Sequence, residues 1–447
     1  MCNGFKRRKS ALLSAACVAL LAGAFSIVNV EVGVKQSVAA ESDKFSSPTG
    51  IVANRDVYYP GTESLAPDEM RVIACGSGIP MPRLKQASPC FLIELGNGDK
   101  FIFDMGVGAM ERITSLGISL DYLDKIFITH LHMDHMGDLP AFYILGPQNN
   151  RSKGLRVWGP GGGGSPEKWG MKSAMGHMVK TWTWMTDTLV GLIDGSSLGL
   201  EVTEYDWSKI NNVIYDENGV IIRSLPAIHL EQSASLILEW NGLKLAYSGD
   251  TIPNKWWIKH TKGVDLSIHE AFFPPALAMK KWGFSAQEAL NAVTTVHSTA
   301  AFFGKVMALT QPKHAVAFHV QNDFDTLPAM IEAVRKIYDG PLDFAQDYMV
   351  WNVTKDGTRT RMAVVNPESY PVPPLGEKEV AVGDEAYKTP EWVLDGFPDE
   401  ITAIAEGIYD DFNKENGTDY KFKLKKIITA RECRKALPMH RPDNWES

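Results

Sequence analysis

The sequence predicts a mixed fold of the α/β or α+β class. Short runs rich in β-branched and aromatic residues are separated by glycine-containing turns, as in RVIACGSG and CFLIELGNGDKFIFDMG. Asn241-Gly242 joins two further runs of this kind and is a strong hairpin signal. Helical stretches such as SAQEALNAVTTVHSTAAFFGKVMALT lie between the strands. Many strands with interspersed helices are typical of this class.

The first forty residues have the pattern of a secretory signal peptide. A cationic start, MCNGFKRRKS, precedes an apolar run of 18 residues, and small residues before Glu41 offer cleavage after Ala40. An uncleaved anchor is the alternative, because a run of this length is borderline for spanning a membrane. Cleavage predicts a periplasmic or secreted protein with no stable membrane insertion.

Charge argues against one class of partner. The chain carries 45 Lys and Arg against 53 Asp and Glu, a net charge of −8. Residues 1–40 hold five basic residues and one acidic residue, so their removal leaves −12 on the rest of the chain. A net negative protein repels a polyphosphate backbone, and nucleic acid is therefore not the expected partner.

Composition divides the chain into four predicted parts. The signal peptide is followed by a lead-in at 41–69 and a main domain at 70–365. A proline-rich linker and a C-terminal extension occupy 366–447. Within the main domain, residues 165–200 are rich in Trp and Met and are predicted to be helical. This insertion either packs on the core or forms a wall over a site, and packing is the more common role of such residues.

Three cysteines remain once the signal peptide is removed. They are Cys75, Cys90 and Cys433, an odd number for an oxidising compartment. A Cys75–Cys90 disulfide between neighbouring strands and three buried or free thiols are both compatible with the sequence. None of the three has the spacing of a metal site.

The densest group of coordinating side chains is FITHLHMDHMGDLP, residues 127–140. His130 and His132 continue an apolar strand at period two, so both imidazoles point to one side and can reach one ion. After the chain turns, Asp134 and His135 can face a second ion. Imidazole with carboxylate suits zinc, with manganese or iron as alternatives. A histidine cluster without metal is the other interpretation, which these residue types in this strand-to-turn setting disfavour.

Three further coordinating residues follow at strand ends. His229 ends IIRSLPAIH, Asp250 follows a hairpin strand in LAYSGDT, and His319 ends AVAFH. A lone histidine near a strand is more often structural, but the end of a rigid strand is where a metal site can be built. Two ions about 3.5 to 4 Å apart can hold a bridging hydroxide and stabilise both the attacking and the leaving oxygen.

This series of motifs resembles that of the metallo-β-lactamase-fold hydrolases, over roughly residues 70–365. The resemblance implies an αββα sandwich with two divalent ions at one sheet edge, here with a helical insertion and a C-terminal extension. Asp104, in FIFDMG, matches a supporting aspartate of the family. The implied ligands are His130, His132 and His229 for one ion and Asp134, His135 and His319 for the other, with Asp250 as the bridge.

A narrower resemblance points to the ribonuclease Z-like branch, which includes arylsulfatases and phosphodiesterases. VDLSIHEAFF and VHSTAAFFGKVMALTQPKHAVAFH resemble two of its segments, in which a glutamate like Glu270 orients a histidine like His297. That histidine protonates the leaving group, and the carboxylate is expected to raise its pKa. A purely structural His297 is the alternative.

The sequence departs from ribonuclease Z itself in two ways. HVQNDFD replaces the serine-containing segment usual there, and no basic, glycine-rich arm for tRNA is evident. Processing of tRNA is therefore not expected. NRDVYYPGTE and GPLDFAQDYMVWNVTKDG are more weakly similar to exported metallo-hydrolases of the guanitoxin-biosynthesis group.

The resulting hypothesis is an exported dinuclear-metal hydrolase that uses a bridging hydroxide to cleave a small phosphodiester or an aryl sulfate ester. Its expected catalytic residues are Asp134, which orients the nucleophile or accepts its proton, and the pair Glu270 and His297. A lactonase or β-lactamase-type carbonyl hydrolase is one alternative, and a non-catalytic metal- or ligand-binding protein is another. The expected partner is a small-molecule ester, and the oligomeric state stays open, a homodimer included.

Overall fold

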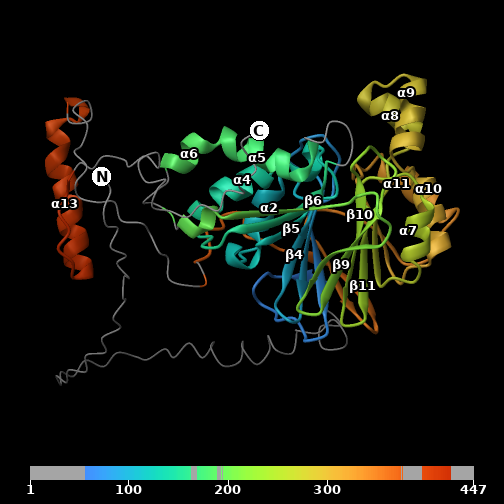
Figure 1. Ribbon diagram of the computed structural model, residues 1–447, viewed down its shortest axis with the longest axis horizontal. Helices are drawn as coiled ribbons and strands as arrows, with labels where there is room; N and C mark the ends of the chain where they lie inside the picture. Colours follow the sequence, from blue (N-terminus) through green and yellow to red (C-terminus); the bar gives the residue numbers. More distant parts are fainter. Residues whose placement is uncertain are drawn as a thin grey trace.

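Two β-sheets face each other in the computed structural model, and helices cover both outer faces (Figure 1). The predicted signal peptide and Cys433 lie outside the described part of the chain. The structure describes residues 56–162, 169–188, 193, 195–373, 375 and 395–423.

The first sheet has nine strands in the order β1-β16-β15-β2-β3-β4-β5-β6-β7. From β16 to β4 the neighbours are antiparallel, whereas β4, β5, β6 and β7 run parallel. The carboxyl ends of these parallel strands therefore meet at one edge. The strands are β1 (Val57–Tyr58), β2 (Met70–Gly76), β3 (Cys90–Leu95), β4 (Lys100–Phe103), β5 (Lys125–Phe127), β6 (Leu155–Pro160), β7 (Leu200–Tyr205), β15 (Met349–Thr354) and β16 (Gly357–Ala363).

The second sheet has seven strands in the order β14-β13-β12-β11-β10-β9-β8. Its strands from β8 to β11 pair antiparallel, and those from β11 to β14 pair parallel. The turn between β10 and β11 has positive φ at both Asn241 and Gly242, as an Asn-Gly hairpin requires. The strands are β8 (Asn212–Glu217), β9 (Val220–Pro226), β10 (Ala234–Trp240), β11 (Leu243–Tyr247), β12 (Leu266–Glu270), β13 (Ala315–Phe318) and β14 (Leu342–Phe344).

Three apolar layers hold the sheets and helices together. The middle layer lies between the sheets and is rich in aromatic side chains, among them Phe91 and Phe127. One outer layer joins the first sheet to α2, α4 and α5, and the other joins the second sheet to α7, α9, α10 and α11. The predicted αββα sandwich is confirmed. These helices are α2 (Ala109–Ser115), α4 (Leu139–Leu145), α5 (Met171–Thr181), α7 (Lys255–His260), α9 (Ala286–Asn291), α10 (Ala300–Thr310) and α11 (Leu327–Arg335).

The Trp- and Met-rich insertion forms α5 and α6 (Thr183–Thr188). Met171, Met175 and Met178 of α5 are buried against the first sheet, so the methionines of this helix have the packing role. Trp182 and Trp184 are 43% and 78% exposed and contribute little to that core. The insertion is therefore a helical cover for the first sheet whose tryptophans face solvent.

A disulfide joins two neighbouring strands of the first sheet. It links Cys75 in β2 to Cys90 in β3, with 4.9 Å between their Cα atoms, which decides between the two alternatives left by the sequence.

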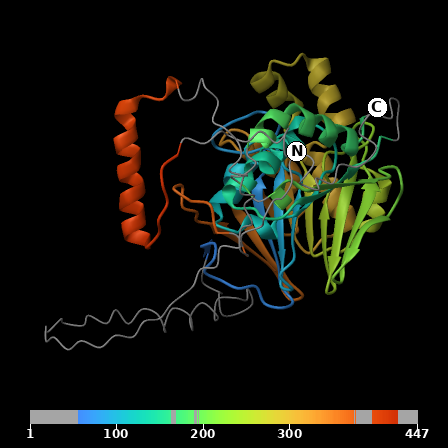
Figure 2. The same cartoon turned by 60° about the vertical axis from the view of Figure 1, so that its left-hand side comes forward.

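Helix α13 (Asp399–Asn416) lies apart from the sheets and has no buried residue (Figure 2). Among the described helices, none is long and apolar enough to cross a membrane.

Candidate metal centre

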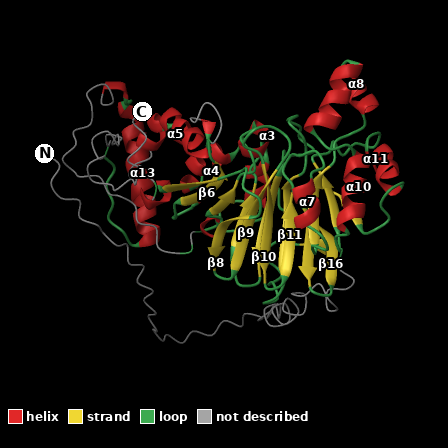
Figure 3. Cartoon of the chain, turned by 45° about the vertical axis from the view of Figure 1, so that its right-hand side comes forward, coloured by secondary structure: helices red, strands yellow, loops and turns green. Residues whose placement is uncertain are grey.

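The first part of the centre follows β5 directly. His130 and His132 lie in the loop after this strand, and Asp134 and His135 lie on the short helix α3 (Met133–Met136). Figure 3 shows α3 above the ends of the strands. The buried strand fixes where the loop begins, and the tight helical turn brings Asp134 and His135 back beside the two preceding histidines.

The second part comes from the other sheet. His229 follows β9, Asp250 follows β11, and His319 follows β13. The backbone of His319 has φ of 57°, a left-handed conformation that is uncommon for a residue other than glycine. Such conformations persist where the surrounding structure holds them, and they are frequent at functional sites.

All seven predicted ligands come together in the two predicted groups. In each group the potential ligand atoms lie within 4.8 Å of one another, and Asp250 is a member of both. One carboxylate oxygen of Asp250 lies 3.8 Å from Nε2 of His130, and the other lies 3.2 Å from Nε2 of His135. The groups are His130, His132, His229 and Asp250, and Asp134, His135, Asp250 and His319.

Buried atoms of this cluster lack hydrogen-bond partners. Nε2 of His135 and Oδ1 of Asp250 are both buried and face each other at 3.2 Å without the geometry of a hydrogen bond, and neither makes a hydrogen bond elsewhere. A buried polar atom without a partner is costly, and a coordinated cation would satisfy both atoms at once. Imidazole nitrogens and carboxylate oxygens are also the donors that zinc and similar ions take. The residues present therefore fit divalent metal ions.

The electrostatics at His130, His229 and Asp250 favour the protonation states that metal binding requires. His135 is the exception: burial opposes its charge, but Asp250, Asp134 and Asp104 outweigh burial and raise its pKa, so metal must displace a proton from this ring. Burial lowers the pKa of His229 to about 4 and, with the nearby His135, that of His130 well below its usual value. Burial opposes ionisation of Asp250, but His319 and His135 outweigh it and lower the pKa of this carboxyl. Neutral imidazole and ionised carboxylate are the forms that coordinate metal.

Asp104 supports the centre from behind, as the resemblance implied. It is fully buried, and its Oδ2 accepts hydrogen bonds from the hydroxyls of Thr129 and Tyr247. The same oxygen lies 2.6 Å from Nδ1 of His135. This contact fixes the ring so that Nε2 faces the cluster, which is how outer residues orient metal-binding histidines.

His297 and Glu270 form a pair next to the cluster. Glu270 ends β12, and His297 follows a π-helical turn at Ala292–Val296, so that Nδ1 of His297 lies 3.0 Å from Oε2 of Glu270. The ring of Phe272 stacks on His297, with 4.8 Å between centroids and 11° between planes. A π-helical turn inside a helical segment is frequently found at a functional site.

The predicted rise in the pKa of His297 is wrong. Burial lowers the pKa of this imidazole despite the opposing carboxylates of Asp250 and Asp134, whereas the sequence predicted a rise caused by Glu270. Burial and the negative Asp250 raise the pKa of Glu270 well above its usual value, so this carboxyl tends to keep its proton. The prediction treated Glu270 as a full negative charge, which its burial disfavours.

Several positioning contacts were not foreseen from the sequence. Besides Phe272, they include the carbonyl oxygen of Val296, which lies 2.9 Å from Nδ1 of His229, and the backbone N–H of Thr251, which donates to Glu270. Each joins segments far apart in the chain, and a single sequence carries no signal for such pairs. Of the remaining histidines, His314 pairs with Asp343 at 2.7 Å, away from the cluster.

Comparisons with known proteins found relatives in sequence. A family model described as anti-Pycsar protein Apyc1 matches residues 70–154. Ribonuclease Z of Archaeoglobus fulgidus is 24% identical over 318 residues, which cover 64% of this chain and 98% of that protein. Ribonuclease Z of Sulfolobus acidocaldarius is 23% identical over 295 residues, which cover 61% of this chain and 94% of that protein.

Two solved structures, one bacterial and one human, are similar to this chain. The metallo-β-lactamase-fold protein YhfI from Bacillus subtilis has a TM-score of 0.48 at 16% identity, covering 64% of this chain and 99% of its own. The short form of human tRNase Z has a TM-score of 0.46 at 19% identity, covering 63% of this chain and 98% of its own.

Fold, site and sequence similarity support a metal-dependent hydrolase with the metallo-β-lactamase fold. The similarity to ribonuclease Z runs over nearly the whole length of those relatives. Within the class, the sequence relatives carry the name of the branch that the motifs predicted, ribonuclease Z.

Proposed function

We propose that this chain is an exported dinuclear zinc hydrolase that cleaves a small phosphodiester. The observation that carries the proposal is the His297–Glu270 pair beside the metal-binding residues. An alkoxide leaving a phosphodiester needs a proton, and a positioned donor supplies it. An aryl sulfate ester remains the second candidate, because an aryl oxide from a weakly acidic phenol also gains from a proton as it leaves, although less than an alkoxide does. Carbonyl hydrolysis needs this pair less.

The ligand groups given above would hold one zinc ion each and share Asp250. When bound, the ions supply an activated water and stabilise negative charge on the ester oxygens. Asp134 is the protein's proton acceptor for that water. Burial opposes its ionisation, but His135 and His319 outweigh burial and lower its pKa, so this carboxyl is ionised and holds no proton of its own.

The His297–Glu270 pair can donate a proton despite the lowered pKa of the imidazole. Whether the shared proton lies on Glu270 or on Nδ1 of His297, the pair holds the same number of protons. In both arrangements Nε2 of His297 keeps its N–H. Donation from Nε2 to the leaving oxygen is balanced by movement of the shared proton onto Nδ1. Burial of Glu270 therefore preserves the proton that burial of His297 would otherwise lose.

Sequence similarity and charge together favour a small phosphodiester. The relatives are named ribonuclease Z, and a ribonuclease acts on the phosphodiester bonds of RNA. The charge of −12 on residues 41–447 supports a substrate smaller than RNA, because a strongly acidic protein repels a long polyphosphate. Nucleic acid as a substrate is thus a testable alternative to this part of the proposal.

Initial rates test the bond that is cleaved. The zinc-loaded protein is assayed on an aryl phosphodiester, an aryl sulfate and an aryl lactone, with Asp134→Ala as the inactive control and the exposed His177→Ala as the matched active control. A phosphodiester rate that disappears only in Asp134→Ala is the expected result. A lactone rate alone would assign a carbonyl hydrolase, and zinc binding with no turnover of any ester would assign a binding protein.

Export is tested by fractionation. Expressed with its own N-terminus in a bacterial host, the chain should be recovered outside the cytoplasm with Glu41 as its first residue. Recovery in the membrane fraction with an intact N-terminus would contradict cleavage after Ala40 and favour an anchor.

A further inference from the structure

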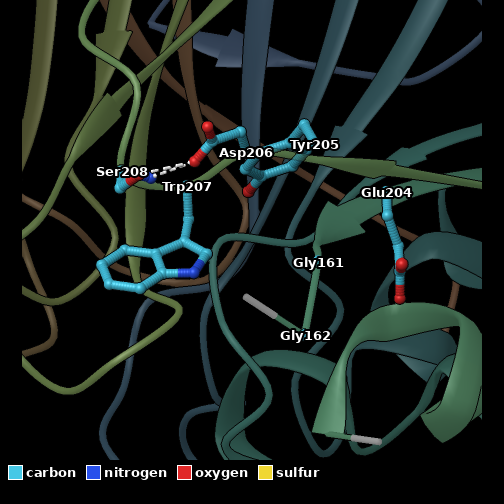
Figure 4. Close-up of a pocket in the computed structure, with 7 residues that line it drawn as sticks. All are labelled: Gly161, Gly162, Glu204, Tyr205, Asp206, Trp207 and Ser208. Atoms are coloured by element: carbon cyan, nitrogen blue, oxygen red, sulfur yellow. Dashed lines mark hydrogen bonds between the residues drawn. The ribbon is translucent and has the colours of Figure 1, made fainter. Parts of the chain in front are cut away.

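A cavity of about 580 Å³ opens at the carboxyl ends of β6 and β7. Figure 4 shows the Trp207 ring and the Glu204 side chain on either side of Gly161 and Gly162. The two glycines follow β6, and Trp207 follows β7. Because glycine has no side chain, the space between the indole ring and the carboxylate stays open. The volume is within the range of sites that bind small organic molecules.

The lining of the cavity is acidic and aromatic. Glu204 and Asp206 contribute carboxylates, and none of the described residues that line the cavity carries a positive charge. Asp206 is held by the backbone N–H and the hydroxyl of Ser208, at 3.0 and 2.6 Å, and these hydrogen bonds lower its pKa. The part-buried Trp207 packs on the core between the sheets. An aromatic face beside acidic side chains attracts a cationic nitrogen and disfavours phosphate.

Glu204 has one oxygen that accepts a backbone hydrogen bond and one that lies beside a glycine of the cavity lining. Its Oε1 accepts the backbone N–H of Lys172 at 2.8 Å, at the start of α5. Its Oε2 lies 3.7 Å from the position that a Cβ on Gly161 would take. Support of α5 therefore accounts for Oε1 and leaves Oε2 for a ligand. Glutamine at this position would keep the support and remove the charge.

The cavity lies within reach of the metal centre along the same sheet edge. The backbone N–H of Gly161 donates to the carbonyl of Tyr205 at 2.9 Å, and the Tyr205 hydroxyl donates to the carbonyl of Ile128 at 2.8 Å. Ile128 precedes His130 by two residues. Since neighbouring strands are about 4.8 Å apart, one to two strand spacings put the cavity about 5–10 Å from the end of β5.

We propose that this cavity binds a positively charged nitrogen group of the substrate. Resting on the function proposed above, this makes the substrate a phosphodiester with an ammonium or quaternary ammonium substituent. Trp207 offers its indole face, and Glu204 offers the oxygen that α5 does not use. A phosphodiester with such a substituent occurs both in soluble esters and in lipid headgroups.

A matched pair of esters isolates the charge. p-Nitrophenyl phosphocholine carries a trimethylammonium group, and p-nitrophenyl 3,3-dimethylbutyl phosphate carries a neutral tert-butyl group of the same shape. The zinc-loaded full chain should prefer the first by about tenfold in kcat/KM. Trp207→Leu and Glu204→Gln should bring the ratio close to one, because the rate on the cationic ester falls more than the rate on the neutral ester. Equal rates on both esters in the unaltered protein would overturn the proposal.

Calorimetry with choline separates this inference from the proposed function. Choline should bind the zinc-loaded full chain, and binding should weaken about tenfold in Trp207→Leu. Choline binding without cleavage of either ester would keep the cation site and reject the phosphodiesterase. Cleavage of both esters without choline binding would keep the phosphodiesterase and reject the cation site. Comparison of glycerophosphocholine with phosphatidylcholine vesicles then identifies a soluble or a lipid source by which of the two is cleaved.

Discussion

Replacing His297 by alanine should separate protonation of the leaving group from metal binding. Its Nδ1 lies 3.0 Å from Glu270 and its ring is stacked on Phe272, so Nε2 is the nitrogen left for an ester oxygen. A positioned proton donor contributes about 10²–10⁴-fold to the rate. At 1.36 kcal/mol for each factor of ten, this is roughly 2.7–5.4 kcal/mol of activation free energy. The loss should be large for alkoxide leaving groups and small for p-nitrophenolate, which departs without a proton.

The assay measures kcat/KM for a series of methyl phosphodiesters whose leaving groups differ in pKa, together with zinc content per chain. The variant should show a steeper dependence on leaving-group pKa at unchanged zinc content. His177→Ala, on the exposed face of α5, is the control and should match the unaltered protein. His297 also belongs to a third group of potential ligands with Asp250, Glu270 and His319. An equal loss of kcat/KM for every leaving group, or a loss of zinc, would therefore refute the role of His297 as the proton donor. It would instead indicate that His297 is a metal ligand.

Three further predictions concern metal affinity and stability. Asp104→Asn should lower metal affinity about 10–100-fold, because it weakens the contact that orients His135; chelator competition measures this, and an unchanged affinity would contradict it. Burial raises the pKa of Glu69 from 4.5 to about 7, so the folded chain holds this proton more tightly than the unfolded chain. The free energy of unfolding should therefore fall as pH rises from about 4.5 to about 7, by up to roughly 1.4 kcal/mol per pH unit, and urea titrations should show a flatter profile in Glu69→Gln. Loss of the Cys75–Cys90 disulfide, which spans 15 residues, should cost about 3 kcal/mol, and a serine double variant as stable as the parent would argue against that contribution.

The metal-binding residues could be predicted because each follows a recognisable local pattern. His130 and His132 continue a buried strand at period two, and Asp250 follows a hairpin that the Asn-Gly turn already marks. Parallel strands then bring their carboxyl ends to one edge without further information. The layering of the sandwich, by contrast, came from resemblance to a family and was not derivable from strand patterns.

The environment of each residue could not be predicted in the same way. The pKa of His297 depends on how deeply the pair with Glu270 is buried and on the ring of Phe272, which no local pattern reveals. The role of the insertion was left open because methionine and tryptophan serve cores and surfaces alike. The structure separates them, with Met171 fully buried and Trp184 mostly exposed.

The metal centre takes residues from both sheets, and this has a consequence for how the protein matures. His130 to His135 belong to the first sheet, whereas His229, Asp250 and His319 belong to the second. A growing chain therefore completes the first ligand group only at Asp250 and the second only at His319, and β15 and β16 complete the first sheet after both. Once bound, metal stabilises the contact between the sheets by mass action. A chelator should accordingly loosen this contact before it unfolds either sheet.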